Sequence, residues 1–325
     1  MAMQVHEGLD GLRSLAPGQI ISIGNFDGVH RGHMEILRRA RELRGSAPAS
    51  RLAVVTFEPH PLTVLRPQLA PPRLTPPALK RELLQTAGVD DYVVLPPTRE
   101  VLDLEAEQFW NILRDHVRPS AMVEGNSFFF GKGRRGTIQR LREWSAAANV
   151  QLHVVESVAV TLLDLQVVPV SSSLIRWLIA YGRVRDASIC LGRAYALEGE
   201  VVHGHHRGRT IGIPTANINC DELLVPADAV YAGRCTIDQA TYPAAISIGT
   251  NPTFAEHARQ VEAHLLGFSS DLYGRTVRLE LLDWLRDQWR FRGVDTLKEQ
   301  IARDLQEVEA INRVHDPCVR QSSLV

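Results

Sequence analysis

The chain has 325 residues, of which 45% are hydrophobic and 22% are charged, values typical of a folded globular protein rather than a disordered or fibrous one. At roughly 150 residues per domain, this length predicts two domains. The 36 Lys and Arg residues are balanced by 37 Asp and Glu residues, and a net charge of −1 argues against a dedicated nucleic-acid-binding protein.

The cysteines and the first residues indicate the compartment. Cys190, Cys220, Cys235 and Cys318 form no CxxC pair, so they are interpreted as buried thiols in a reducing compartment rather than zinc ligands or a disulfide scaffold. The start, MAMQVHEGLD, lacks a basic segment followed by an apolar stretch, and no apolar run reaches the length of a membrane span. We therefore expect a cytoplasmic protein that has no membrane partner.

The first half of the chain alternates strand-like and helix-like segments. Apolar runs rich in Val and Ile predict strands at 20–26, 51–57, 91–95, 120–124 and 150–156. Helical periodicity between these runs predicts helices at 33–44, 78–87 and 105–117. This alternation predicts an α/β domain, with a doubly wound parallel sheet covered by helices on both faces.

The pattern changes after about residue 187. Short alternating runs separated by Gly, Pro and Asp predict an antiparallel β-barrel, with strands at 198–203, 230–237, 242–248, 260–266 and 276–282. A closing helix is predicted by an apolar stripe, with Thr296 and Glu299 as its capping box; the stripe is Leu297, Ile301, Leu305 and Val308. We therefore expect domains at 1–187 and 188–312, and a tail at 313–325.

Polar and glycine-rich segments follow several strands of the predicted sheet, where parallel sheets bind ligands. The segment GNFDGVHRGH (24–33) places His30 and His33 three residues apart at the start of a helix, where both can face one anion. SSSLIR (171–176) brings three hydroxyls and Arg176 to the start of another helix. Together these groups predict a polyphosphate site without a P-loop, because the Walker pattern is absent. The alternatives are incidental surface histidines, a metal-binding pair, and serines that only cap a helix.

The second half contains GEVVHGHHRGRTIGIPTANI (199–218), which is dense in Gly, His and Arg. Arg207 and Arg209 are candidate phosphate ligands, and Thr215 and Asn217 are hard oxygen donors that suit Mg²⁺ shared with ATP phosphates. In QVEAHLL (260–266), Glu262 alternates with apolar residues and is expected to point away from the apolar face. The alternatives are a solvated strand face for Glu262 and a solvated basic loop.

Taken in order, these motifs resemble one family over residues 15–312. GNFDGVHRGH, TFEPHP (56–61), EGNSFFFGKGRRGT (124–137) and SSSLIR are similar to the adenylyltransferase module of prokaryotic bifunctional riboflavin kinase/FMN adenylyltransferases. The flavokinase module of that family is resembled by GHHRGRTIGIPTAN (204–217), VYAG (230–233), SIGTNPTF (247–254), VEAHLLGFSSDLYG (261–274) and LRDQWRF (285–291).

For the first domain, the resemblance implies a nucleotidylyltransferase in which the FMN phosphate attacks the α-phosphorus of ATP in line and expels pyrophosphate. His30 and His33 would stabilise charge on the triphosphate, and Arg176 would hold the outer phosphates. The implied ATP and phosphate ligands are Gly24, Asn25, Phe26, Asp27, Gly28, Ser171, Ser172 and Ser173. The implied flavin contacts are Phe57, Pro59, Asn126 and Phe128.

For the second domain, the resemblance implies a flavokinase barrel. Thr215 and Asn217 would bind Mg²⁺ with ATP, and Glu262 would act as general base on the ribityl 5′-hydroxyl of riboflavin before it attacks the γ-phosphoryl group. Arg286 and Phe291 would shape the flavin end. The implied substrates are riboflavin, FMN and ATP, the cofactor is Mg²⁺, and the products are FMN and FAD.

Departures from the family pattern keep alternatives open. Ser127 stands where the family has Asp or Asn, and Leu174 where it has a basic or polar residue, so one alternative is a riboflavin kinase with a weak or inactive adenylyltransferase domain. An alternative of another class is a non-catalytic flavin-binding RNA regulator, which the near-neutral charge disfavours. A different nucleotidylyltransferase would leave the second half unexplained. We expect no nucleic-acid partner, and a homo-oligomer is left open.

Overall fold

The computed structural model describes residues 2–45, 50–204, 212–220, 222–250 and 259–315. The chain divides into two compact units. The sheet unit comprises Met1–Pro72, Pro77–Val160 and Val168–Ser171, and the barrel unit comprises Arg73–Pro76, Thr161–Val167 and Ser172–Val325. These units describe how the chain packs. The predicted assignment of one activity to residues 1–187 and of another to residues 188–312 concerns function and stays a prediction.

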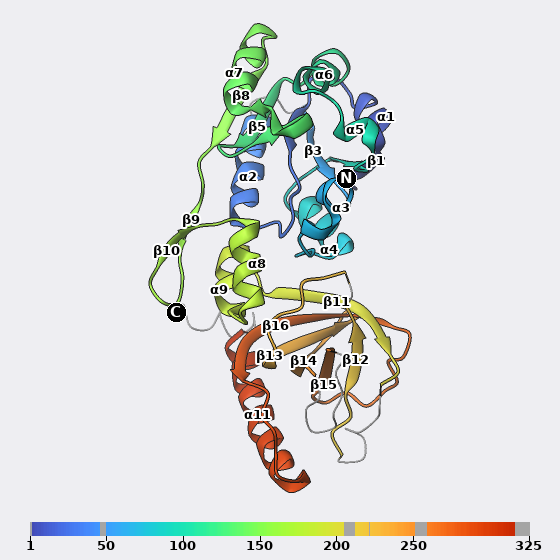
Figure 1. The fold of residues 1–325 in the computed structure, drawn as a ribbon, viewed down its shortest axis with the longest axis vertical. Helices are drawn as coiled ribbons and strands as arrows, with labels where there is room; N and C mark the ends of the chain where they lie inside the picture. The colour runs from blue at the N-terminus through green and yellow to red at the C-terminus, as the bar shows by residue number, and fades with distance from the viewer. Residues whose placement is uncertain (1, 46–49, 205–211, 221, 251–258, 316–325) are drawn as a thin grey trace. The chain divides into compact units, whose positions relative to one another are not determined.

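The sheet unit is built around a parallel sheet whose described strands follow the order β1-β4-β3-β2-β5-β8. Figure 1 labels β1, β3, β5 and β8 of this sheet. The strands are β1 (Gln4–Glu7), β2 (Ile20–Ile23), β3 (Leu52–Phe57), β4 (Asp91–Leu95), β5 (Ala121–Gly125) and β8 (Gln151–Val155). Every neighbouring pair is parallel. The predicted strands are confirmed, whereas β1 was not predicted, because QVHE carries only one β-forming apolar residue.

Helices cover both faces of this sheet, as the alternating sequence pattern predicted. Leu37 of α2 (Arg31–Gly45) and Leu84 of α4 (Pro77–Thr86) pack on one face in a cluster with Val54. The other face carries α1 (Gly8–Arg13), α5 (Arg99–Leu102), α6 (Ala106–Ile112) with the π-helical η2 (Leu113–Val117), and α7 (Ile138–Ala147). Shorter elements are α3 (Leu62–Leu65), η1 (Pro67–Leu69), η3 (Lys132–Arg134), and the strand pairs β6 (Phe129–Phe130) with β7 (Gly136–Thr137) and β9 (Ala159–Thr161) with β10 (Val167–Pro169).

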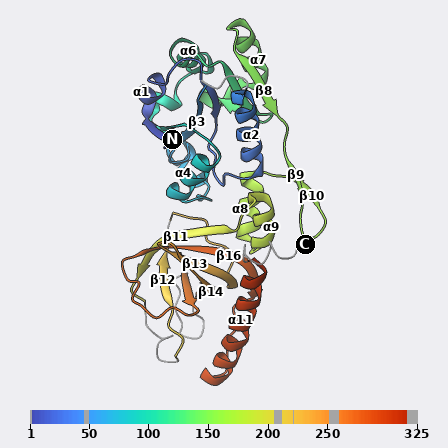
Figure 2. The ribbon, with the colours of Figure 1, turned by 180° about the vertical axis from the view of Figure 1, so that it is seen from behind.

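The barrel unit contains a closed antiparallel barrel with the order β11-β12-β15-β14-β13-β16. The strands are β11 (Tyr195–Val202), β12 (Ala216–Asn219), β13 (Ala229–Ile237), β14 (Ala240–Gly249), β15 (Gln260–Leu265) and β16 (Thr276–Arg286). The unit also holds α8 (Ser172–Ala180), α9 (Val184–Leu191) and α11 (Val294–His315), and α11 lies against β13 and β14 (Figures 1 and 2). The predicted barrel and closing helix are confirmed, and β12 is an additional strand.

The predicted capping box of the closing helix is wrong. Because α11 begins at Val294, Thr296 lies inside its first turn rather than at its N-cap. The Thr296 hydroxyl donates to the Gly293 carbonyl at 2.9 Å, so it does not accept from a helix N–H. The helix runs to His315, into the predicted tail, and residues 316–325 lie outside the described part of the chain.

Candidate active sites

The strand order of the sheet reverses at β2, which has β3 on one side and β5 on the other. Such a reversal opens a crevice at the carboxyl ends of the strands, where open α/β sheets bind ligands. The ladder between β2 and β5 is short, pairing Ile20 with Ala121 and Ile21 with Met122. Beyond it, the Ile23 N–H donates to the Glu124 side-chain carboxyl at 2.9 Å. A side chain therefore occupies the place where the two strands stop pairing.

Glu124 is a buried acid at this edge, only 1% exposed. Burial penalises its charged form and raises its pKa well above the ordinary value, and the hydrogen bond from Ile23 offsets only part of this effect. The sequence analysis did not single out Glu124, although a carboxyl group at the end of an otherwise apolar strand is a detectable signal.

The loop after β2 is fastened to β3 and bent sharply. The Gly24 N–H donates to the Val55 carbonyl at 3.0 Å, and the Thr56 hydroxyl donates to the Asn25 carbonyl at 3.0 Å. Phe26 and Val29 have left-handed backbones, with φ of 47° and 38°. Such conformations strain a residue that bears a Cβ and persist where the surroundings enforce them. Both side chains are buried, at 2% and 0% exposure, so core packing holds the loop in this shape.

The two predicted histidines meet at the N-terminus of α2. Their rings are stacked, with centroids 3.6 Å apart and planes 15° apart. The His33 N–H donates to His30 Nδ1 at 3.3 Å, so this ring nitrogen acts as an acceptor and Nε2 is the ring nitrogen suited to donate. A Cβ at Gly32 would lie 3.2 Å from the His30 ring, so a larger residue there would require the ring to shift by a few tenths of an ångström. The pair therefore presents an N–H donor beside a helix N-terminus, which favours anions.

The serine run begins beside this helix. The Val170 carbonyl lies 3.9 Å from where a Cβ on Gly32 would stand, so the residue before Ser171 is close to the N-terminus of α2. Ser172, Ser173 and Arg176 belong to α8 of the barrel unit. Their action together with the histidines stays a prediction.

The predicted flavin contacts of the sheet unit follow β3 and β5. Phe57 ends β3 and Pro59 follows it. Asn126 is exposed; its amide donates to Glu156 Oε2 at 2.7 Å and accepts from the Ser157 hydroxyl at 3.2 Å. Phe128 is half-buried, and its ring is stacked on Phe130 at 5.4 Å. The carboxyl ends of β3 and β5, the two strands that flank β2, thus carry these side chains, and their role in flavin binding stays a prediction.

A second group of polar side chains lies on the barrel. Asn217 on β12 pairs directly with Glu262 on β15, which pairs with Ser247 on β14. Residues directly opposite in an antiparallel ladder project on the same face, so the three form one row. The Thr215 hydroxyl donates to Glu262 Oε2 at 3.3 Å. The apolar residues that alternate with Glu262 are buried, which confirms that its carboxylate points away from the apolar face.

Gly204 makes room for the amide in this row. A Cβ built on Gly204 would lie 2.0 Å from Asn217 Nδ2, so any larger residue there would displace the Asn217 side chain. The oxygens of Thr215, Asn217 and Glu262 are the hard donors that Mg²⁺ prefers. Among the residues that the structure describes, no cluster of three or more His, Cys, Asp or Glu side chains is arranged to hold a metal ion. Mg²⁺ fits this row best as an ion shared with nucleotide phosphates.

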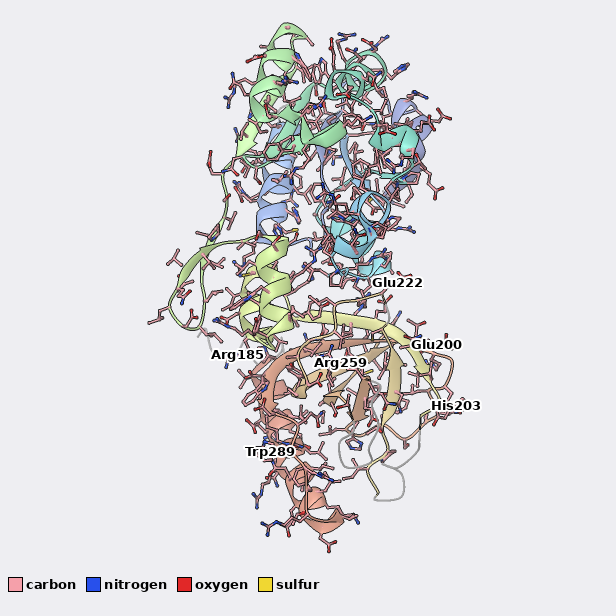
Figure 3. All side chains as sticks on the ribbon, viewed as in Figure 1. Arg185, Glu200, His203, Glu222, Arg259 and Trp289 are labelled. Carbon is pink, nitrogen blue, oxygen red and sulfur yellow. The ribbon has the colours of Figure 1, made fainter. Side chains whose placement is uncertain are left out.

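A cavity of about 520 Å³ adjoins the row at Asn217. His203 and Arg259, both labelled in Figure 3, also line it. The His203 ring is stacked on Tyr273, with centroids 4.0 Å apart. Arg259 Nε donates to Asp228 Oδ1 at 2.6 Å, which ties the Arg259 side chain to the loop before β13. The predicted phosphate ligands Arg207 and Arg209 lie outside the described residues.

Ser247, in this row, has a hydrogen-bond partner outside the row that was not predicted, Gln288. The Gln288 amide donates to the Ser247 hydroxyl at 2.9 Å and to the Ile248 carbonyl at 3.2 Å. Gln288 follows β16, and only the barrel register brings it to β14. The sequence therefore offered no signal for this contact.

Arg286 is held by protein groups on several sides. It is 7% exposed, and its Nη2 lies 2.9 Å from Asp304 Oδ2 on α11. Its guanidinium also lies over the rings of Trp289 and Phe291, 5.1 and 5.5 Å from their centroids. The structure thus brings Arg286 and Phe291 together, and Asp304 balances the arginine charge. Their contribution to the flavin end stays a prediction.

None of the helices that could be searched, those of the described residues, is long and apolar enough to cross a membrane.

Comparison with known proteins covers both units. A family model described as riboflavin kinase matches residues 191–312, and one described as FAD synthetase matches residues 13–173. The chain is 35% identical to a bifunctional riboflavin kinase/FMN adenylyltransferase of Escherichia coli K12, over 93% of this chain and 96% of that protein. It is 34% identical to the protein of that name from Pseudomonas fluorescens, over 95% and 98% of the two chains. A crystal structure titled macrolide-efflux protein from Streptococcus pneumoniae superposes with a TM-score of 0.83 at 28% identity, over 95% of this chain and 99% of that one.

Proposed function

Because the chain belongs to the family of bifunctional riboflavin kinase/FMN adenylyltransferases, we propose that its two reactions run at two separate sites, one on the barrel and one at the carboxyl edge of the sheet. The enzyme phosphorylates riboflavin with ATP to give FMN and then adenylylates FMN with a second ATP to give FAD and pyrophosphate. The alternative of a weak adenylyltransferase rests on the departures at Ser127 and Leu174, and the near-neutral charge disfavours an RNA regulator.

At the kinase site, Glu262 is the general base. It accepts the proton of the ribityl 5′-hydroxyl, which attacks the γ-phosphorus of ATP while the bond to ADP breaks. The Thr215 hydroxyl, which donates to the carboxylate at 3.3 Å, orients Glu262. Arg286 and Phe291 order the segment at the flavin end, and Arg207 and Arg209 contact phosphate.

Mg²⁺ is the cofactor that this donor set suits, held by Thr215 and Asn217 together with ATP oxygens. When bound, it neutralises charge on the transferred phosphoryl group. The space that Gly204 leaves around the Asn217 amide supports this role.

At the adenylyltransferase site, the FMN phosphate attacks the α-phosphorus of ATP and pyrophosphate leaves in line. His30 donates from Nε2 to the phosphate oxygens, and the stacked His33 shares this task. The loop residues Gly24, Asn25, Phe26, Asp27 and Gly28 shape the phosphate pocket, and Phe57, Pro59, Asn126 and Phe128 contact the flavin. Ser171, Ser172, Ser173 and Arg176 bind the outer phosphates.

The compartment proposed for these reactions is the cytoplasm. Cys190, Cys220 and Cys235 are buried thiols, as the sequence predicted for a reducing environment, whereas Cys318 lies outside the described residues. Burial raises the pKa of the Cys235 thiol to about 12, which keeps it protonated and unreactive.

The observation that carries the proposal most directly is the row in which Asn217 faces Glu262 and Thr215 donates to its carboxylate. The test is chromatography of riboflavin, FMN and FAD in reactions with ATP and Mg²⁺. Glu262→Gln should lower the rate of FMN formation by about 10²-fold, the usual contribution of a general base, and leave FMN-to-FAD conversion intact.

His33→Asn should lower the rate of FAD formation from FMN by about 10²-fold and leave FMN formation from riboflavin unchanged. A Glu262→Gln enzyme with the wild-type kinase rate would overturn the kinase assignment.

A further inference from the structure

A buried lysine lies under the histidine loop and has no part in the mechanism above. Lys80 is on α4 and is only 3% exposed. Its ammonium donates to the Asn25 carbonyl at 2.6 Å, to the Thr56 hydroxyl at 3.0 Å and to Glu58 Oε2 at 3.4 Å. Burying an ammonium group costs free energy unless the group is hydrogen-bonded and paired with an opposite charge. The three oxygens around Lys80 compensate that cost.

Lys80, Thr56 on β3 and the Asn25 carbonyl in the loop are each hydrogen-bonded to the other two. Thr56 also donates to the Asn25 carbonyl, at 3.0 Å, so one backbone oxygen receives bonds from both side chains. Thr56 is itself fully buried at the end of β3. The carbonyl of Asn25 is thereby fixed with respect to both α4 and β3.

Asn25 is the last residue before the left-handed turn that leads to His30. Phe26 follows with φ of 47°, and Val29 has φ of 38°. The Val29 N–H donates to the Phe26 carbonyl at 3.2 Å, which closes the turn. A strained turn keeps its shape only where its ends are held. The bonds to the Asn25 carbonyl hold the start of this turn, and the buried side chains of Phe26 and Val29 hold the turn itself.

The charge of Lys80 is also accounted for within the protein. Glu58 supplies a carboxylate at 3.4 Å, and the three N–H donors of an ammonium match the three oxygens described. Lys80 therefore acts on the loop rather than on a substrate phosphate.

We propose that Lys80 is a positioning residue for adenylyl transfer, and that it sets His30 and His33 through the Asn25 carbonyl. This inference rests on the proposed function of the histidine site. Lys80 acts on the placement of the histidines in the transition state. Its loss should therefore lower kcat more than it changes the affinity for substrates.

The test compares Lys80→Met with Arg81→Met, a matched control at the neighbouring exposed position of α4. Methionine fills the space of the lysine stem, and Glu58, 24% exposed at its side chain, stays solvated, so the unit should fold. Lys80→Met should lower kcat for FAD formation from FMN by about 10-fold to 100-fold, with KM for ATP and FMN changed by less than about threefold. Arg81→Met should keep wild-type values, and the kinase rate of the same chain reports the amount of active protein.

Amide hydrogen exchange of the same full-length variants gives a readout that does not depend on turnover. Lys80→Met should speed exchange in residues 24–30 and leave β3 and β4 as in the wild type. Thr56→Val removes the second donor to the same carbonyl, so the double variant should lose less activity than the product of the two single losses.

A wild-type kcat in Lys80→Met, or faster exchange throughout the sheet unit, would overturn the proposal. The proposal would also be overturned if the loss of kcat in the double variant equalled the product of the losses in Lys80→Met and Thr56→Val. These outcomes are distinct from a failure of the proposed function, in which the wild-type enzyme makes no FAD or His33→Asn keeps full activity.

Discussion

The buried side chain of Glu124 makes the stability of the sheet unit depend on pH. Its carboxyl takes the Ile23 N–H where β2 and β5 stop pairing, and burial raises its pKa well above the ordinary value of 4.5. Between that value and the folded-state pKa, the folded chain binds more protons than the unfolded chain. The stability of the sheet unit therefore falls as pH rises through this range.

Glu124→Gln should remove this penalty, because the amide oxygen still accepts from Ile23 and carries no charge. We expect the variant to be more stable than the wild type at pH 8, with a difference that shrinks toward pH 4.5. The slope cannot exceed about 1.4 kcal/mol per pH unit for one proton. Denaturant unfolding measures it, followed by the fluorescence of the five tryptophans, of which Trp110 and Trp144 belong to the sheet unit.

The exposed Glu143→Gln on α7 is the control and should not change this pH dependence. Parallel stability curves for Glu124→Gln and the wild type from pH 4.5 to 8 would show that Glu124 is not held protonated by the fold.

At the scale of elements, the kinase site depends on the close approach of the chain after β11 to β12. Val202 pairs with Asn217, and Gly204 two residues later passes against the Asn217 amide. The contact is with the end of a flexible side chain, so a methyl group at 204 would move the amide rather than break the barrel.

Gly204→Ala is therefore expected to lower the kinase rate by about 10-fold or more, since misplacing a group by about 1 Å can cost up to 10² in rate. The loss should be largest at low Mg²⁺ concentration, and FAD formation from FMN should be unchanged. Gly293→Ala, where a Cβ would meet nothing within 4 Å, is the control. Titration of the kinase rate with Mg²⁺ measures the effect, and a Mg²⁺ dependence like that of the wild type would contradict it.

Most of the elements could be predicted because their buried residues form either a short continuous run or a regular alternation. The strands β2 to β5 are continuous apolar runs, and β15 alternates strictly. The strand β12 was missed because ANIN is mostly polar and short, and its place depends on partners far along the chain. The predicted capping box was wrong because the helix begins at Val294, two residues before Thr296, and not after it.

The site residues were predictable as chemistry but not as geometry. The spacing of His30 and His33 indicated one anion site, yet their stacking follows from a loop whose anchor, Lys80, is 55 residues from Asn25. Likewise, nothing in the sequence near Ser247 points to Gln288, because their contact spans 41 residues and requires the closed barrel.

At the scale of the whole molecule, each compact unit has its own sheet or barrel and its own polar site. The two reactions share FMN, which is the product of one and the substrate of the other. If the two sites act independently, FMN made by one molecule can be used by another.

The most direct test is to mix Glu262→Gln enzyme with His33→Asn enzyme and follow riboflavin, FMN and FAD by chromatography in the presence of ATP and Mg²⁺. We predict that each variant alone forms almost no FAD from riboflavin, whereas the mixture forms FAD after a lag in which FMN accumulates. No FAD from the mixture, or full FAD synthesis from riboflavin by either variant alone, would contradict the assignment of the two reactions to two separate sites.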